Sequence, residues 1–117
     1  VSHAAAQIAL TVGAKLIVAY TVSGSTARRI AKYRPCTPLI AISPSASTCR
    51  RLCMTWGVRA LEGPSVADLD ELPRAVDTLC AKHGLAKPGD LVVITVGAPL
   101  DVPGTTNTLR VHKISGV

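Results

Sequence analysis

The sequence predicts an α/β fold with three layers, α/β/α, in which helices cover both faces of a mostly parallel five-stranded sheet. Helix-like and strand-like segments alternate along 117 residues, a length that suits one domain spanning 1–117. The strand-like segments are short apolar runs of the kind that parallel sheets bury on both faces. The final strand follows a loop rather than a helix, so we expect this last strand to be antiparallel to its neighbour.

The first half of the chain alternates helix and strand three times. Gly13 ends the first helix, and Arg34-Pro35 stops the second because the residue before a proline disfavours helical backbone. Ser45 or Ser47 can cap the third helix. The expected helices are residues 4–10, residues 26–33 and a third that follows its serine cap and runs to about residue 56, and the expected strands are residues 15–20, 39–42 and 58–61.

The second half begins with the longest candidate helix, residues 68–83. Pro73 is tolerated only in a first turn, which places the true start near Leu72. Two strands are expected after it, a continuous apolar run at residues 91–96 and a half-exposed one at residues 106–114. The apolar positions of the helix lie on one stripe at helical spacing: Leu69, Leu72, Val76, Leu79 and Cys80.

The charge of the chain favours anionic partners. Thirteen Lys and Arg stand against 7 Asp and Glu, a formal net charge of +6. Nucleic acid is not expected as a partner, because only Tyr20, Tyr33 and Trp56 could stack on bases. Two explanations of the basic excess stay open, a solvated surface and a basic field around a phosphate pocket.

The cysteines and histidines give no metal or catalytic pattern. We expect the four thiols to be small buried side chains in a reducing, cytoplasmic compartment, and the three histidines to be surface or capping residues. No apolar run approaches membrane-spanning length, so no membrane partner is expected. The chain begins at Val1 rather than Met, as a processed product or a fragment would. The residues concerned are Cys36, Cys49, Cys53, Cys80, His3, His83 and His112.

The sharpest functional signal is the segment Thr-Val-Ser-Gly-Ser-Thr at residues 21–26, between an expected strand and an expected helix. A helix start presents unpaired N–H groups, and small hydroxyl residues let a phosphate approach them. Ligands of parallel sheets bind at the carboxyl ends of strands, where the loop 97–104 is also expected. The same residues could equally serve as turn and cap residues alone. The candidate phosphate-binding residues here are Thr21, Ser23, Gly24, Ser25 and Thr26.

A series of motifs in a specific order and spacing resembles the C-terminal domain of pyruvate kinase over about residues 4–114. The strongest single piece is Gly-Thr-Thr-Asn-Thr at residues 104–108. The motifs occupy residues 21–28, 32–35, 38–44, 56–58, 88–93 and 103–111.

This resemblance implies a regulatory and assembly domain of a glycolytic enzyme. The parent would transfer a phosphoryl group from phosphoenolpyruvate to ADP, using magnesium and potassium, as a homo-oligomeric tetramer. In such proteins the loop matching residues 21–26 wraps the phosphate of an allosteric effector. The loop matching residues 101–105 closes over it, which adds Pro103, Gly104 and Thr105 to the expected site.

The resemblance also implies what this domain lacks. The chemistry belongs to a barrel domain and a lid domain, and the barrel of the same chain would be a partner. We therefore expect no catalytic residues, metal site or cofactor within residues 1–117, and no kinase activity of this chain alone.

Two departures from the family pattern bear on the ligand. Ser25 stands where members that bind a sugar bisphosphate often have a basic residue, and His83 stands where they have an Arg. Fewer fixed positive charges would neutralise a second phosphate poorly. A monophosphate, AMP, free phosphate or sulfate, and no effector at all, stay open.

Two other functions stay open as well. One is a stand-alone phosphate- or nucleotide-binding module without catalysis, and the other is a structural oligomerisation domain with a silent pocket. The last strand is expected at a sheet edge, where it could pair with its copy in another subunit.

Overall fold

The computed structural model describes residues 2–22, 24–64, 69–96 and 108–114. Within these ranges helices and strands alternate in the predicted order, and the longest helix begins at Leu72, as Pro73 in its first turn indicated. The elements are α1 (Ser2–Val12), β1 (Leu16–Tyr20), α2 (Ser25–Ala31), β2 (Leu39–Ser43), α3 (Ala46–Leu52), β3 (Val58–Glu62), the 3-10 helix η1 (Leu69–Glu71), α4 (Leu72–His83), β4 (Leu91–Val96) and β5 (Thr108–Lys113).

Helix α3 is shorter than the sequence suggests. It ends at Leu52 rather than near Trp56. The backbone N–H groups of Met54 and Thr55 donate to the carbonyls three residues earlier, at 3.2 and 2.9 Å, so the chain tightens into a turn. Gly57 then takes a positive φ of 80° and leads into β3.

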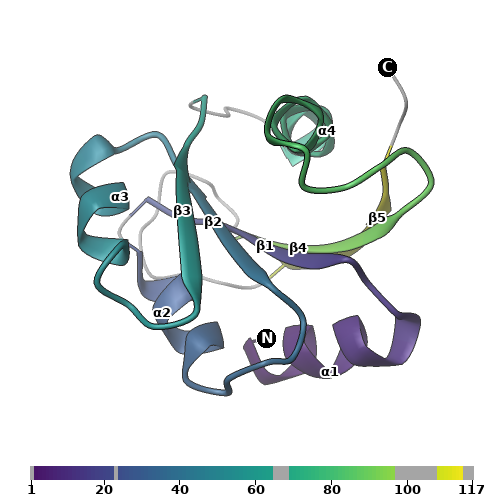
Figure 1. Ribbon diagram of the computed structural model, residues 1–117, viewed down its shortest axis with the longest axis horizontal. Coiled ribbons are helices and arrows are strands. Elements are labelled where there is room, and N and C mark those ends of the chain that lie inside the picture. The colour runs from purple at the N-terminus through teal and green to yellow at the C-terminus, as the bar shows by residue number, and fades with distance from the viewer. Residues whose placement is uncertain (1, 23, 65–68, 97–107, 115–117) are drawn as a thin grey trace.

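The five strands form one sheet in the order β3-β2-β1-β4-β5 (Figure 1). The strands β3, β2, β1 and β4 pair in parallel, while β5 pairs antiparallel with β4, which confirms the predicted fold class. The turn before β4 is closed by Asp90, whose Oδ2 accepts the Lys87 N–H at 2.9 Å.

The side chains of β1 divide between two cores. Leu16, Val18 and Tyr20 pack in the core that includes α4, and Ile17 and Ala19 pack in the core that includes α1, α2 and α3. Figure 1 shows the same division, with α4 alone on one side of the sheet and the other three helices opposite. Among the described residues, one face of the sheet therefore receives three α-helices, and the other face receives one α-helix, which η1 precedes.

An ion-pair contact joins the edge strand β5 to α4. His112 Nε2 lies 2.8 Å from Asp77 Oδ1, and the two side chains are only 13% and 10% exposed. The expectation of a surface or capping role is wrong for His112, because its register opposite Val92 turns it toward the α4 core. Each side chain thereby gives the other a hydrogen-bonding partner at a half-buried position.

All four cysteines are free thiols. Only Cys80 is fully buried, and Cys36 and Cys53 are exposed, so the expectation of buried thiols is wrong for those two. Burial, with a smaller contribution from Asp77, raises the pKa of the Cys80 thiol above its ordinary value. In the parts of the chain that the structure describes, no helix has both the length and the apolar character needed to span a bilayer.

Truncating the α4 core should destabilise the fold. Leu72 is 2% exposed, so Leu72→Ala should cost about 2–5 kcal/mol of unfolding free energy, measured by urea denaturation with circular dichroism. The matched control is Leu10→Ala on α1, where the leucine is 72% exposed and the cost should stay within about 0.5 kcal/mol. Equal costs at the two positions would contradict this packing.

Candidate functional site

The loop after β1 lies at the carboxyl edge of the sheet. Its first residue still belongs to the strand ladder, because the Thr21 N–H donates to the Ile42 carbonyl at 2.9 Å. The Thr21 hydroxyl then accepts the Gly24 N–H at 2.8 Å, which ties the start of α2 to the end of β1. Thr21 is 5% exposed, so its hydroxyl holds the loop from inside.

Gly24 is the position where this loop has close neighbours and a backbone that disfavours a side chain. It has a φ of 91° and is the N-cap of α2. A Cβ atom at position 24 would lie 2.9 Å from Arg28 Nη1 and 3.3 Å from Leu52 Cδ2. The glycine thus lets the Arg28 guanidinium lie directly against the loop backbone, where it supplies a positive charge.

Helix α3, which follows β2, supports the first loop from the side. The Thr48 hydroxyl donates to the Val22 carbonyl at 2.7 Å and accepts from Arg51 Nη2 at 3.1 Å. Thr48 is positioned by the start of α3, where its N–H donates to Ser45 Oγ at 3.3 Å. Ser45 is therefore the cap of α3, one of the two serines expected for this role.

Sequence reasoning missed Thr48 and Arg51 as parts of this site. They lie 26 and 29 residues beyond Val22, the loop residue whose carbonyl Thr48 holds. The available signal was the parallel pairing of β1 with β2, because the carboxyl ends of neighbouring parallel strands lie together.

The expected site residues have different surroundings. Thr21, Gly24 and Thr26 are buried, and Ser25 is half-buried at the first position of α2. Both Ser25 and Thr26 already take part in polar or electrostatic interactions within the chain. Ser23, Pro103, Gly104 and Thr105 lie outside the described residues, so the meeting of the two loops stays a prediction.

The structure corrects the inference drawn from His83. This residue ends α4, and the next residue, Gly84, lines a pocket with Lys15 and Pro38, which precede β1 and β2. His83 therefore belongs to the amino edge of the sheet, whereas residues 21–26 lie at the carboxyl edge. Of the two departures from the family pattern, only Ser25 lies at the carboxyl edge with residues 21–26.

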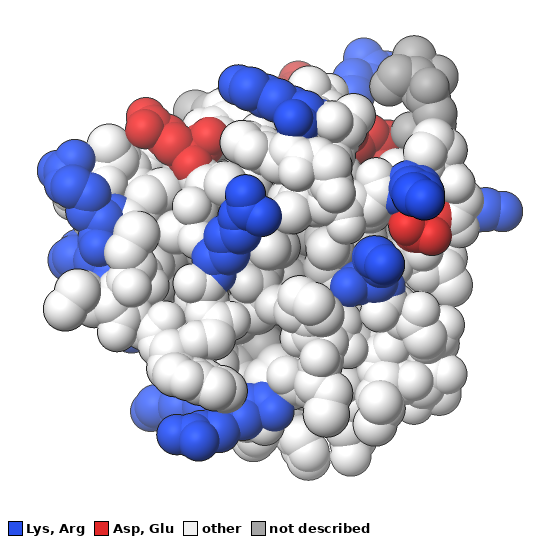
Figure 2. Space-filling model, in the orientation of Figure 1, with Lys and Arg blue, Asp and Glu red and all other residues white. Residues whose placement is uncertain are grey.

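The chemistry available around the loop is anion binding. Arg28 and Arg51 contribute the nearby charges, and the first turn of α2 has no acidic residue. Within the described ranges no three His, Cys, Asp or Glu side chains converge as metal ligands would. Basic side chains are spread over the face seen in Figure 2 rather than gathered in one stripe.

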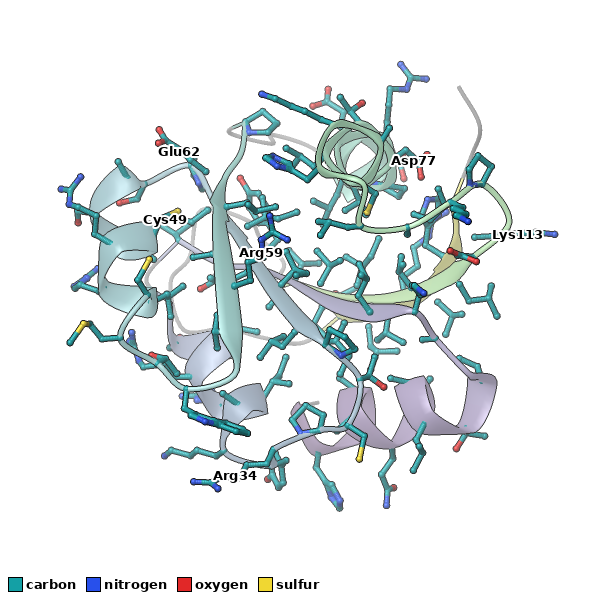
Figure 3. All side chains as sticks on the ribbon, viewed as in Figure 1. Arg34, Cys49, Arg59, Glu62, Asp77 and Lys113 are labelled. Atoms are coloured by element: carbon teal, nitrogen blue, oxygen red, sulfur yellow. The ribbon has the colours of Figure 1, made fainter. Side chains whose placement is uncertain are left out.

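Cys49 lies beside this region but is a poor nucleophile. Its Sγ is 3.8 Å from the Ser43 carbonyl, and Glu62 at the end of β3 is its charged neighbour (Figure 3). Burial, followed by the Glu62 carboxylate, raises the pKa of the Cys49 thiol above its ordinary value. The thiol form therefore prevails at neutral pH, and thiolate chemistry is not favoured here.

Comparison with known proteins gives a consistent result. The chain matches the family described as pyruvate kinase, alpha/beta domain, over residues 1–112. It is 42% identical over 115 residues to a pyruvate kinase of Geobacillus stearothermophilus, covering 98% of this chain and 20% of that protein. It is 41% identical over 113 residues to a pyruvate kinase of Agrobacterium vitis, covering 97% of this chain and 24% of that protein.

A solved structure gives the same match in three dimensions. The fold superposes on the crystal structure of a pyruvate kinase from Cryptosporidium parvum with a TM-score of 0.84 at 26% identity. The match covers 97% of this chain and 22% of that one. The chain thus spans roughly a fifth to a quarter of the length of these relatives.

Replacing Gly24 should test the close approach in the loop. Gly24→Ala and Gly57→Ala both place a side chain at positive φ, at a cost of about 1–2 kcal/mol. Gly24→Ala should cost at least about 1 kcal/mol more, because its methyl group meets Arg28 and Leu52 whereas one at Gly57 meets nothing within 4 Å. Chemical denaturation measures both, and equal losses would contradict the packing at Gly24.

Removing the Thr48 hydroxyl should loosen the loop. Thr48→Val leaves the Val22 carbonyl without this donor and should destabilise the fold by about 1–3 kcal/mol in urea denaturation. Thr78→Val is the control, because the exposed Thr78 hydroxyl bonds only the Arg74 carbonyl of its own helix, at 3.0 Å. Its cost should stay within about 0.5 kcal/mol, and a similar cost for Thr48→Val would contradict the proposed support.

Proposed function

Because this chain belongs to the pyruvate kinase alpha/beta domain family, we propose that it is the regulatory and assembly domain of a pyruvate kinase. The parent protein would transfer a phosphoryl group from phosphoenolpyruvate to ADP. The Mg²⁺ and K⁺ that the family implies would act outside this chain, whose described residues hold no cluster suited to a metal ion.

The regulatory part of this function is binding of one phosphate at residues 21–26. The observation that carries it is the built loop at the carboxyl edge, with the Arg28 guanidinium against its backbone at Gly24. The Thr21 and Thr48 hydroxyls hold the loop in shape before a ligand arrives, which lowers the ordering cost of binding. Ser25, half-buried at the first position of α2, adds a hydroxyl to the first-turn N–H groups.

The charges near the loop favour a ligand with a single phosphate. Arg28 lies against the loop at Gly24, and Arg51 bonds Thr48, which holds the loop. Ser25 adds no positive charge to these two. A ribose phosphate, AMP or inorganic phosphate fits this supply better than a sugar bisphosphate does. Pro103, Gly104 and Thr105 would close over such a ligand, as the loop matching residues 101–105 does in the family.

Assembly is the second part of the proposed function, and β5 is the element that favours it. This strand is an outer strand of the sheet, and its Val111 side chain is 42% exposed. An uncovered outer strand can pair with its own copy around a two-fold axis. A strictly monomeric mass of the intact parent protein would contradict this part of the proposal.

A thermal-shift titration tests the phosphate site. The ligands are fructose 1,6-bisphosphate, ribose 5-phosphate, AMP and inorganic phosphate, applied to the native chain and to Thr26→Ala and Ser25→Ala. A bound ligand at about 100 times its dissociation constant should add about 2.7 kcal/mol of stability. Both substitutions should abolish this gain, and a monophosphate should give the larger gain.

The control is Ser47→Ala, an exposed serine in the first turn of α3, which should keep the full gain. An equal gain in Ser25→Ala and in the native chain would place the ligand elsewhere. No gain with any ligand would favour a structural oligomerisation domain with a silent pocket.

A further inference from the structure

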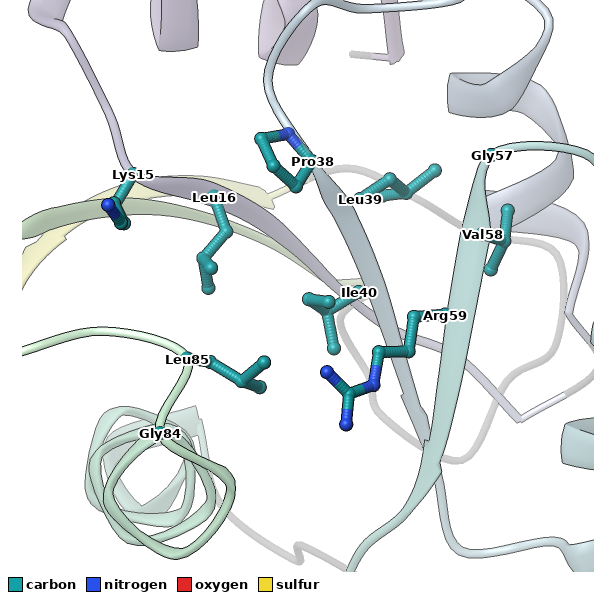
Figure 4. A pocket seen from close by; sticks show the side chains of 10 residues that line it. All are labelled: Lys15, Leu16, Pro38, Leu39, Ile40, Gly57, Val58, Arg59, Gly84 and Leu85. Atoms are coloured by element: carbon teal, nitrogen blue, oxygen red, sulfur yellow. The ribbon is translucent and has the colours of Figure 1, made fainter.

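We propose that the chain has a second ligand site, which takes a small organic anion with an apolar body, at the amino edge of the sheet. The site is a pocket of about 480 Å³ between the starts of β1, β2 and β3 and the C-terminal end of α4 (Figure 4). It lies at the opposite ends of the strands from residues 21–26. It therefore does not rest on the proposed phosphate site.

The pocket arises because α4 alone covers its face of the sheet. The helix packs on β1 and β4 through residues such as Val76 and Cys80. Gly57 and Gly84 form part of the rim, and a Cβ atom at either would meet nothing within 4 Å, so no side chain narrows the opening there. The volume is in the range of small-molecule sites, about 300–1,000 Å³.

The floor of the pocket is apolar. Leu16 and Ile40 are buried core residues of β1 and β2, and Leu85 follows the end of α4. Figure 4 shows these three side chains facing the same space. A ligand that fills it must present an aliphatic or aromatic body, because a fully polar molecule would lose hydration without gaining partners.

The charged groups of the pocket are both positive. Arg59 lies opposite Ile40 in the strand register, on the face of the sheet that α4 covers, and it is exposed. Figure 4 shows its guanidinium directed over the pocket between Ile40 and Leu85, and Lys15 lies on the rim. No acidic residue lines the pocket, and no described residue gives either side chain a hydrogen bond or ion pair.

This charge pattern determines the ligand class. A guanidinium presents parallel donors that match a carboxylate or a phosphate. The ligand is thus an aryl or alkyl carboxylate or phosphate, with its head group on Arg59 and its body on the apolar floor. Lys15 would add long-range attraction from the rim.

The test uses four probes that distinguish the contribution of the anionic head group to binding from that of the apolar body. They are 4-phenylbutyrate, phenyl phosphate, the neutral 4-phenylbutan-1-ol and inorganic phosphate, titrated into the 117-residue chain by two-dimensional amide NMR. At least one of the two aryl anions should shift the amides of Gly57, Arg59 and Gly84. Which of the two does so shows whether the pocket prefers a carboxylate or a phosphate head group. The alcohol and inorganic phosphate should bind this pocket at least about tenfold more weakly.

Substitutions at Arg59 make the test specific. Arg59→Gln should weaken the aryl anion by about tenfold or more, and Arg59→Lys should restore part of the affinity. Arg110→Gln on β5, at the far edge of the sheet, should leave the affinity unchanged. The amide spectrum of each variant shows whether it is folded, and Lys15→Gln provides a second variant that should weaken the anion if Arg59→Gln does not fold.

Three results would overturn the proposal. One is unchanged affinity in Arg59→Gln, and another is equal binding of the alcohol and the anions. The third is that Arg59→Gln self-associates while its affinity for the aryl anion is unchanged. Arg59 would then be a charge that keeps the outer strand β3 from pairing with a strand of another chain. Phosphate-induced shifts at Ser25 should be the same in Arg59→Gln, so the failure of one site is distinguishable from the failure of the other.

Discussion

The rest of the structure depends on the complete burial of β1 between two parallel neighbours. Its backbone groups must all be paired because water does not reach them, and β2 and β4 supply those partners. Its side chains alternate between the two cores, so a shift of one residue in register would exchange both sets. This constraint determines where the chain leaves the sheet, after Tyr20, and therefore where the loop 21–26 lies.

Because the strands β3, β2, β1 and β4 are parallel, the carboxyl edge and the amino edge of the sheet carry different kinds of side chains. At the carboxyl edge the chain passes from strands into the starts of α2 and α3, and the Thr48 hydroxyl of α3 holds the loop after β1 through the Val22 carbonyl. At the amino edge the chain enters the strands from helix ends, and an apolar floor lies open beneath Arg59. An anion at the first edge would meet a preformed polar loop, while one at the second would need an apolar body.

The two faces of the sheet are covered unequally, and small residues explain part of the difference. Ala5, Ala9 and Ala27 are fully buried and let α1 and α2 approach the sheet closely, with α3 beside them. On the other face α4 stands alone, and its contact with β5 includes the polar pair of Asp77 and His112. One face is thus covered by three helices, while the other leaves room beside its single helix. The outer strands β3 and β5 also differ, because β5 is tied to α4, whereas Arg59 on β3 is exposed and has no hydrogen bond or ion pair with another described residue.

The sequence by itself determined the element order, the buried strands and the sharp turns, because apolar periodicity and the backbone limits of Gly and Pro act over a few residues. Pro73 located the start of α4, and Gly24 marked the turn into α2. Only the tertiary structure decided that Thr48 holds the loop, that His112 faces Asp77, and that His83 belongs to the opposite edge from residues 21–26. These contacts join residues 26 and 35 positions apart, and no local preference encodes which side chain will meet another across a sheet. The position of Arg59 shows the same limit, because no local preference indicates that this exposed residue lies opposite Ile40, on the α4 face of the sheet and beside the pocket.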